Sequence, residues 1–332
     1  EVWILTKTLT GESAVVVNDA QFFKTIDIID SKVVQATFFI VYSVIFILGV
    51  FGNVVVCFVV FRKREMHTVT NLLITNMALS DILLCIFAVP LTPMYTFLGR
   101  WVFGRFLCYL MPYAQGMSVY ICTLTLTSLA VDRFVVIMFP YYPKMKLTTC
   151  KYIIGIIWMF SSIVTCPYDL FMGIQIVNRT YYCEEVWPSD NSRKIFGVCT
   201  SIFQFLIPFL VISVCYISVN IKLNNRARAK LKASKARRAD AFRDRKKSMN
   251  KMLISMVTMF GISWLPLNIL NIYNDFSTHI TDWNYYYISF FLAHSMAMAS
   301  TCYNPFLYAW LNKNFRKEFK LVLPFFKWMG DV

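Results

Sequence analysis

The side chains of this chain that could do chemistry are suited to hydrogen bonding and ion pairing between helices. Residues 106–131 include no charged side chain, and then Asp132 and Arg133 follow together. At about 1.5 Å per residue, a helix over this run is longer than the roughly 30 Å apolar core of a bilayer. Gln115 brings an amide into the same run, on the helix face that it shares with Ser118. We therefore interpret the segment as a membrane helix that carries a signal from a polar group near one face to a charge pair at the other.

Two later apolar runs also carry polar side chains. From Trp264, steps of four, three and four residues reach Asn268, Asn271 and Asp275. These four side chains share one face of a helix. His294 lies at a similar depth in the last run, where a histidine is either a satisfied interior group or a contact for a bound molecule. If these two faces meet the amide of the earlier helix, they form one cavity that opens outward.

An ionisable side chain lies halfway along another apolar run. Asp81 is costly to place there, so a functional role is its default interpretation, and the alternative is a structural hub of hydrogen bonds. Asn53 follows Gly52 in the preceding run and also needs a partner in lipid. We expect Asp81 to be that partner.

The elements that must hold these side chains are membrane helices. Hydrophobic residues make up 58% of the chain and charged residues 15%, far from the balance of a soluble globular domain. The predicted fold class is an all-α membrane protein, a seven-transmembrane helix bundle. The runs long enough to cross a bilayer are 33–61, 68–97, 106–131, 152–172, 195–221, 252–274 and 283–312.

Positive charges are distributed unevenly between the loops. Most of the 33 lysines and arginines fall on one side, which predicts an extracellular N-terminus and a cytoplasmic C-terminus. The net charge of +15 therefore reflects topology, and no nucleic-acid partner is expected. The predicted organisation is an extracellular arm (1–32), the bundle (33–312, with a basic third intracellular loop at 222–250), and an amphipathic cytoplasmic helix 8 with a short tail (313–332). The apolar face of helix 8 is expected to lie on membrane lipid.

Two features of the outer loops agree with this orientation. Cys108 and Cys183 both fall on the outer, oxidising side, so we predict a disulfide between them. Asn178-Arg179-Thr180 is a glycosylation sequon on the same side. Neither a metal-ligand cluster nor a nucleophile with a matching base is visible in the sequence. We therefore expect no metal, no cofactor and no enzymatic activity.

Taken in order, the motifs of the seven runs resemble those of the rhodopsin-like (class A) G-protein-coupled receptors, over residues 33 to about 326. Any one motif is common by chance, whereas all of them in order form a very specific pattern. The matching residues are Gly52-Asn53, Leu79-Ser80-Asp81, Cys108 with Cys183, Asp132-Arg133-Phe134, Trp158, Pro208 with Tyr216, Trp264-Leu265-Pro266, and Asn304-Pro305-Phe306-Leu307-Tyr308.

Within that family, the cavity residues resemble those of neuropeptide Y and neuropeptide F (RF-amide) receptors. The resemblance implies an amidated peptide ligand with an arginine–aromatic end. Asp275 would pair with the ligand arginine, and other cavity residues would hold the amide and the aromatic terminus. Acidic residues at the outer rim would steer a basic peptide. The implied ligand-binding residues are Thr92, Gln115, Gln204, Asn271, Asp275, His294, Glu184 and Glu185.

The resemblance also implies a mechanism of signalling at the plasma membrane. Peptide binding would favour an outward swing of the sixth span about Pro266, and the chain would activate a heterotrimeric G protein of the Gi/o type, with arrestin as a further partner. Lys246 stands where some receptors place an acid that locks the arginine, so Asp132 is left to restrain Arg133. The implied activation switch comprises Asp81, Asp132, Arg133, Tyr216, Trp264, Pro266, Asn304, Pro305 and Tyr308.

The alternatives are a receptor for an unrelated peptide and, in a different class, a membrane transporter or channel. A transporter needs a polar path, usually with several embedded charges or internal repeats, and here Asp81 is the clear mid-membrane charge. A light receptor would need a lysine in the last span for its Schiff base, and none occurs between residues 283 and 312.

Overall fold

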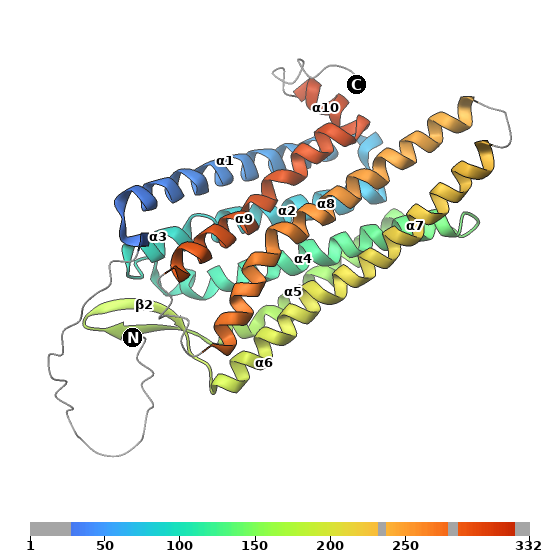
Figure 1. The fold of residues 1–332 in the computed structure, drawn as a ribbon. Coiled ribbons are helices and arrows are strands. Elements are labelled where there is room, and N and C mark those ends of the chain that lie inside the picture. Colours follow the sequence, from blue (N-terminus) through green and yellow to red (C-terminus); the bar gives the residue numbers. More distant parts are fainter. Residues whose placement is uncertain (1–27, 232–236, 278–284, 323–332) are drawn as a thin grey trace.

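The computed structural model describes residues 28–231, 237–277 and 285–322, most of which are helical (Figure 1). The predicted arm at 1–32 lies almost entirely outside the described residues, as does the end of the segment 313–332. The helices in chain order are α1 (Lys32–Arg62), α2 (Val69–Phe87), α3 (Leu91–Leu98), α4 (Gly104–Met138), α5 (Leu147–Leu170), α6 (Asp190–Ser201), α7 (Ile207–Leu231), α8 (Arg237–Phe276), α9 (Tyr286–Leu311) and α10 (Lys313–Val322), with short 3-10 turns η1 (Ile28–Asp30) and η2 (Arg64–Met66).

Two of the membrane spans are interrupted helices. α3 follows α2 after a break at Pro90, whose ring nitrogen cannot donate a backbone hydrogen bond, and the combined span runs Val69–Leu98. α6 and α7 are joined by η3 (Ile202–Leu206), a single π-helical turn. Such turns shift the side chains that follow them around the helix axis. Together these elements form the span Asp190–Asn225.

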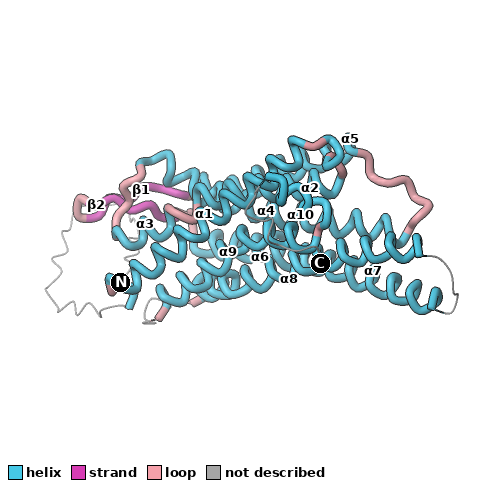
Figure 2. The backbone as a smooth tube through the Cα atoms, turned by 90° about the horizontal axis from the view of Figure 1, so that it is seen from above, coloured by secondary structure: helices cyan, strands magenta, loops and turns pink. Residues whose placement is uncertain are grey.

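Six stretches of the described chain are long and apolar enough to cross a membrane. α9 completes the bundle, although polar side chains such as His294, Ser300 and Asn304 lower its hydropathy. It has no charged residue over its 26 residues, and it packs along α8 and α1. The seven-helix, all-α bundle predicted from the sequence is therefore confirmed (Figures 1 and 2).

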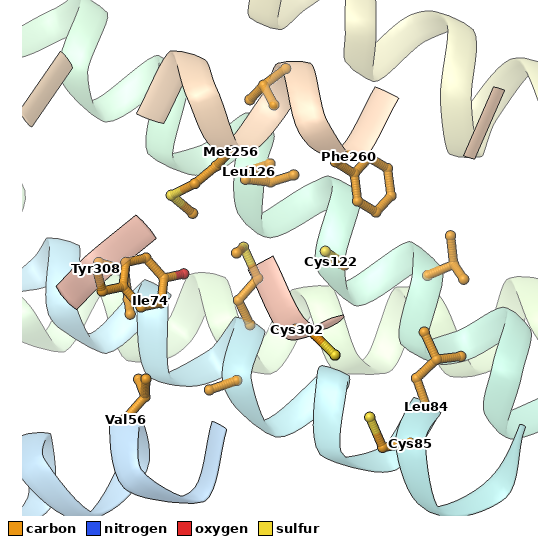
Figure 3. Packing of buried hydrophobic residues seen from close by; sticks show 14 of the residues in the cluster. Val56, Ile74, Leu84, Cys85, Cys122, Leu126, Met256, Phe260, Cys302 and Tyr308 are labelled. Carbon is orange, nitrogen blue, oxygen red and sulfur yellow. The ribbon is translucent and has the colours of Figure 1, made fainter. Parts of the chain in front are cut away.

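The interior of the bundle is built around α4, which contacts α2, α5 and α7. Leu126 of α4 is buried together with Ile74 of α2 and with Met256 and Phe260 of α8 (Figure 3). Lipid tails are as apolar as these side chains, so close packing, rather than transfer from water, holds membrane helices together. The shape of the core therefore depends on how nearly the helices can approach one another.

α1 and α9 lie close together at a glycine. A Cβ atom added to Gly52 would lie 2.9 Å from Cγ of Pro305, which is closer than real contacts of this kind. A hydrogen in place of a side chain lets the Pro305 ring of α9 sit against the α1 backbone. This contact belongs to the small-residue packing that is typical of membrane helices.

Between α5 and α6 the chain forms a β-hairpin that the sequence analysis did not predict. β1 (Met172–Val177) and β2 (Thr180–Glu185) pair antiparallel. Asn178 and Arg179 form the turn, with φ angles of 50° and 62°. Two successive left-handed residues are what a two-residue hairpin turn requires, and Asn tolerates this conformation better than most residues. The sequon residue Asn178 is therefore exposed at the tip of the hairpin.

A disulfide holds this hairpin on the bundle. It joins Cys108 at the start of α4 to Cys183 of β2, as predicted, and both residues are buried beside Trp101. The side of the molecule that carries the hairpin is called the hairpin end below. The opposite side, where α10 lies, is called the α10 end (Figure 1).

At the α10 end, α10 packs its apolar face against the bundle. Phe315 and Phe319 are both buried, and Phe315 stacks on Tyr308 of α9 with the ring centroids 5.4 Å apart. Lys63 pairs with Glu318 at 3.6 Å and ties the helix to the end of α1. The amphipathic helix predicted after the last span is therefore present, but Phe315 and Phe319 of its apolar face meet the bundle and not the lipid.

The described parts of the basic segment 222–250 are helical. α7 continues to Leu231 and α8 begins at Arg237, so both helices project beyond the rest of the bundle at the α10 end (Figure 1). The segment is rich in alanine, arginine and lysine, which favour helices.

Candidate functional site

A cavity of about 270 Å³ opens at the hairpin end, among α4, α5, α6, η3, α8 and the segment that begins in β2. Its wall is mixed, because amide and carboxylate side chains from several elements lie beside aromatic and aliphatic ones. The sequence-predicted ligand residues that line it are Gln115, Gln204, Asn271, Asp275 and Glu185. The predicted convergence of α4 and α8 is therefore present.

The side-chain amides of Gln115 and Gln204 lie in two walls of this cavity. Gln115 belongs to α4, and its neighbour Gly116 offers a backbone carbonyl that accepts a hydrogen bond from Gln204 Nε2 at 3.2 Å. Gln204 lies in the π-helical turn η3, so that turn directs its amide toward α4. The cavity wall therefore contains a hydrogen-bonded contact between two spans.

Trp264 and Asp275 mark two levels of the cavity wall on α8. They are separated by eleven residues of helix, which corresponds to about 16 Å at 1.5 Å per residue. Trp264 is buried, and its indole N–H donates to Ser300 Oγ of α9 at 3.1 Å. Asn268 Nδ2 donates to the Trp264 carbonyl at 2.9 Å. A molecule in the cavity would thus contact a side chain that is bonded to the neighbouring span.

Charged side chains gather at the mouth of the cavity. Arg193 Nη2 lies 3.4 Å from Asp275 Oδ1, and Arg193 Nε donates to Glu185 Oε2 at 3.1 Å. The indole N–H of Trp187 donates to the same Glu185 oxygen at 2.7 Å. One guanidinium therefore lies between two carboxylates that belong to different elements.

Three other residues predicted to contact the ligand do not line this cavity. Thr92 is half-buried on α3, and Glu184 is exposed on β2. His294 is buried in α9, where its Nδ1 lies 2.7 Å from the hydroxyl of Tyr42 on α1 and its ring stacks on Phe290. The histidine contact therefore joins α9 to α1, away from the cavity that contains Gln115 and Asn271.

Asp81 connects α2 to α9 in the middle of the bundle. Asn304 Nδ2 donates to Asp81 Oδ2 at 2.9 Å, and both residues are buried. The predicted partnership of Asp81 with Asn53 is wrong. Asn53 Nδ2 donates instead to the backbone carbonyls of Gly49 and Thr301, each at 2.9 Å. The Thr301 carbonyl needs this donor, because Pro305, four residues later, has no N–H to give it.

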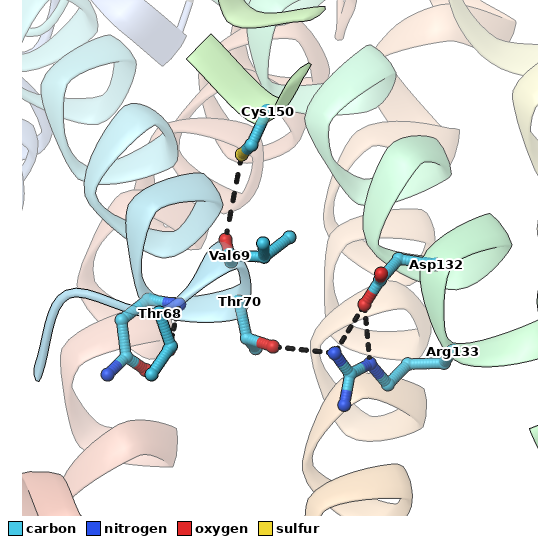
Figure 4. A network of polar contacts seen from close by, with 7 residues as sticks. Thr68, Val69, Thr70, Asp132, Arg133 and Cys150 are labelled. Carbon is cyan, nitrogen blue, oxygen red and sulfur yellow. Dashed lines mark hydrogen bonds and ion pairs between the residues drawn. The ribbon is translucent and has the colours of Figure 1, made fainter. Parts of the chain in front are cut away.

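At the α10 end, the guanidinium of Arg133 pairs with Asp132 and donates to Thr70 Oγ1 at 2.7 Å (Figure 4). Nearby, the Cys150 thiol of α5 donates to the Val69 carbonyl at 3.8 Å. Arg133 is thereby held in a polar network that joins α4 to the start of α2. The remaining predicted switch tyrosines, Tyr216 of α7 and Tyr308 of α9, are both buried.

One polar hub was missed by the sequence analysis. Asn76 of α2 accepts from Trp158 Nε1 of α5 at 2.7 Å and donates to Thr125 Oγ1 of α4 at 2.8 Å. The available signal was an asparagine inside an apolar run, since a buried amide in a membrane has to find partners on other helices. Within the described ranges, no group of three or more His, Cys, Asp or Glu side chains is arranged to hold a metal ion.

Comparison with known proteins assigns the chain to a family. A family model described as "7 transmembrane receptor (rhodopsin family)" matches residues 52–308. The chain belongs to the rhodopsin family of seven-transmembrane receptors. It is 34% identical over 301 residues to neuropeptide Y receptor type 6 of Mus musculus, covering 86% of this chain and 79% of that protein.

Two further relatives of this rhodopsin-family receptor are a human and a fruit-fly protein. The neuropeptide Y receptor type 2 of Homo sapiens is 35% identical over 295 residues, which cover 86% of this chain and 76% of the relative. The neuropeptide F receptor of Drosophila melanogaster is 34% identical over 299 residues, which cover 85% of this chain and 61% of the relative. The chain is therefore a multi-pass membrane receptor and not an enzyme, and the alternative of a transporter or channel is excluded by the family.

Proposed function

We propose that this receptor binds an amidated peptide of the neuropeptide Y or neuropeptide F type and signals through a heterotrimeric G protein of the Gi/o class. The observation that carries the proposal is the cavity at the hairpin end, where amides and carboxylates from α4, η3, α8 and β2 line one polar site. The similarity to neuropeptide Y and neuropeptide F receptors over about 86% of the chain supports a ligand of the same kind.

In this proposal the hairpin end faces the outside of the cell. The basic residues of segment 222–250 and of α10 then lie on the cytoplasmic side, in agreement with the positive-inside rule. The same orientation places the disulfide and the exposed Asn178 in the extracellular space, where glycosylation of that asparagine is expected. The receptor is expected in the plasma membrane.

The peptide enters with its amidated end leading. Its arginine pairs with Asp275, which stands at the cavity mouth, and its amide is held by Gln115 deeper in the site. Gln204 of η3 and Asn271 of α8 offer further hydrogen-bonding groups in the cavity wall. Thr92, Glu184 and His294 were predicted to take part as well. Because they do not line the cavity, their effect on binding is expected to be smaller than that of Asp275.

Activation follows as a population shift. The peptide must bind the active arrangement more tightly than the resting one, and a contact that changes the Trp264–Ser300 pair would do so. α8 then swings outward about Pro266 at the α10 end. Arg133 leaves Asp132 and Thr70 and, with Tyr216 and Tyr308, admits the G protein.

The test replaces the charge of Asp275 without changing its size. Asp275→Asn is expected to weaken binding of an amidated peptide ending in Arg-Phe or Arg-Tyr by about 10- to 100-fold, as loss of a charged hydrogen bond does. Asp190→Asn is the matched control, because Asp190 lies at the start of α6 but does not line the cavity. Competition binding to membranes measures both.

Two results would contradict the proposal. If Asp275→Asn and wild type bind the peptide equally, Asp275 does not hold the arginine. If no amidated Arg-aromatic peptide binds wild type, the ligand class is wrong and a receptor for an unrelated peptide is favoured. Activation sensors for each Gα class, measured after peptide addition, show which class of G protein the receptor activates.

A further inference from the structure

Arg193 joins three elements at the mouth of the cavity. It belongs to α6, its Nε donates to Glu185 of β2 at 3.1 Å, and its Nη2 lies 3.4 Å from Asp275 of α8. The Asp275 side chain is 14% exposed, whereas those of Arg193 and Glu185 are 41% and 38% exposed. The Asp275 carboxylate is thus the least accessible of the three groups, and the arginine reaches it from the solvent side.

Gly197 makes this arrangement sterically possible. It lies one helical turn after Arg193 on α6, and a Cβ atom added there would overlap the Asp275 carboxylate. The absence of a side chain lets α8 bring Asp275 against the α6 backbone, directly beside Arg193. The carboxylate is therefore fixed within reach of a guanidinium from its own chain.

We propose that Arg193 occupies, in the free receptor, the place on Asp275 that the guanidinium of a peptide ligand takes, so that binding exchanges one guanidinium for another. This inference rests on the proposed function. The displaced arginine keeps a partner, because Glu185 already accepts from its Nε and is itself oriented by Trp187. Exchange leaves each carboxylate paired with one cation, whereas a ligand without a cation would leave Asp275 uncompensated.

Arg193 is on this account a specificity-determining residue. A neutral ligand gains nothing at Asp275 by moving Arg193 aside, and a ligand with arginine recovers the ion pair that it breaks. Because a neutral ligand leaves the Arg193–Asp275 pair in place, the internal arginine lowers the affinity of ligands that place a cation on Asp275 and leaves the affinity of neutral ligands unchanged. For a partly exposed pair we expect the competition to weaken binding by about fivefold.

The experiment compares two peptides on four receptors. The probes are an amidated peptide ending in Arg-Phe and the same peptide with citrulline, a neutral isostere, in place of the arginine. The receptors are wild type, Arg193→Gln, Asp275→Asn and the double variant, all as full chains in lipid nanodiscs. Arg193→Gln is expected to tighten binding of the arginine peptide about fivefold. In the Asp275→Asn background, the same substitution is expected to change nothing.

Lys194→Gln is the matched control, because it removes the neighbouring cation of the same helix and leaves the Arg193–Asp275 pair in place. If it tightens arginine-peptide binding as much as Arg193→Gln does, the effect is general charge repulsion and the exchange is overturned. The exchange is also overturned if Arg193→Gln tightens binding of the citrulline peptide equally, or if its effect persists without the Asp275 charge.

A measurement without peptide separates this inference from the proposed function. In thermal unfolding of the same four receptors, the ion pair predicts that the two single shifts do not add, and that the double variant unfolds close to the temperature of Arg193→Gln, which already lacks both ion pairs of Arg193. Strictly additive shifts would show that Arg193 and Asp275 do not interact, and would overturn the exchange even if the peptide binds. If the shifts are non-additive but neither wild type nor Arg193→Gln binds the arginine peptide, the proposed ligand and the exchange both fail, and the pair is structural.

Discussion

The guanidinium of Arg133 donates a hydrogen bond to the hydroxyl of Thr70 over 2.7 Å, while it also pairs with the neighbouring Asp132. The bond crosses from α4 to the start of α2 and holds the arginine at the α10 end of the bundle. In the proposed mechanism this arginine has to leave its resting partners. The strength of the Thr70 contact should therefore help to set how active the receptor is without ligand.

Thr70→Val is expected to raise signalling in the absence of peptide. The substitution keeps the shape of the side chain and removes the acceptor of a charged hydrogen bond, which typically contributes about 1.5–3 kcal/mol. Thr75→Val is the control on the same helix, because Thr75 Oγ1 bonds only to the Asn71 carbonyl of α2 among the contacts described. The measurement is nucleotide exchange on the purified G protein. Equal basal rates for the two variants would show that the Thr70 contact does not restrain activation.

Ser300→Ala is expected to destabilise the receptor more than Ser295→Ala. Ser300 accepts from the buried indole N–H of Trp264, and removing it leaves that donor unpaired at a cost of about 1–3 kcal/mol. Ser295 lies on the same helix but donates to the Leu292 carbonyl of its own turn. Thermal unfolding in detergent should separate the two variants by about 2 °C or more. A larger loss for Ser295→Ala would contradict the role given to the α8–α9 bond.

Gly52→Ala and Gly155→Ala should move stability in opposite directions. A methyl group on Gly52 would lie 2.9 Å from Pro305 Cγ, so α1 and α9 must separate, and overpacking of this kind costs about 1–3 kcal/mol. A Cβ on Gly155 of α5 meets nothing within 4 Å, and alanine is the better helix former by about 1 kcal/mol. Unfolding temperatures of the two variants provide the measurement. If Gly52→Ala is neutral, the close approach of α1 and α9 is not needed for stability.

The effects of replacing Cys108 and Cys183 on surface expression and peptide affinity should not add. Cys108→Ser, Cys183→Ser and the double variant are each expected to reduce surface expression and peptide affinity to the same extent, because any of them releases β2 from α4. Cys166→Ser is the control, since Cys166 is an exposed free thiol on α5. Cell-surface labelling and competition binding check the prediction. A double variant clearly worse than both singles would indicate that each cysteine has a separate role.

The seven membrane spans and the disulfide were predictable because they depend on local properties. A run of apolar residues long enough to cross a bilayer has few alternatives to a helix, since every backbone polar group in lipid must find a partner within the helix itself. Cys108 lies at the outer end of an apolar run and Cys183 lies in an outer loop, so two cysteines on the same oxidising side of the predicted membrane pair for an equally simple reason. The amphipathic character of α10 was likewise predictable from the helical spacing of its phenylalanines.

The contacts between helices were harder to predict. Spacing along a helix places His294 on a face with other polar residues, but it does not give the rotation of that helix, and the ring turns toward Tyr42 of α1. Asn53 finds a carbonyl left free by a proline on another span, which the search for a side-chain partner overlooked. The pairing of Arg193 could not be predicted, because it depends on the folded position of β2 and α8.

The hairpin was missed for a different reason. Its turn uses Asn178 and Arg179 in left-handed conformations, whereas the usual signal for such a turn includes a glycine. Pairing of β1 with β2 also satisfies backbone groups that lie outside the membrane, where water offers an alternative partner. Nothing in the local sequence therefore compelled a strand there.

The disulfide between Cys108 and Cys183 fixes one side of the cavity mouth, because it joins β2 to α4. Glu185 follows Cys183 by two residues, so its carboxylate cannot travel far from α4 whatever the ligand does. α6 and α8 have no such covalent bond to β2, and Arg193 of α6 contacts both Glu185 of β2 and Asp275 of α8. The width of the cavity mouth therefore depends on how far α6 and α8 lie from an edge that is fixed covalently to α4.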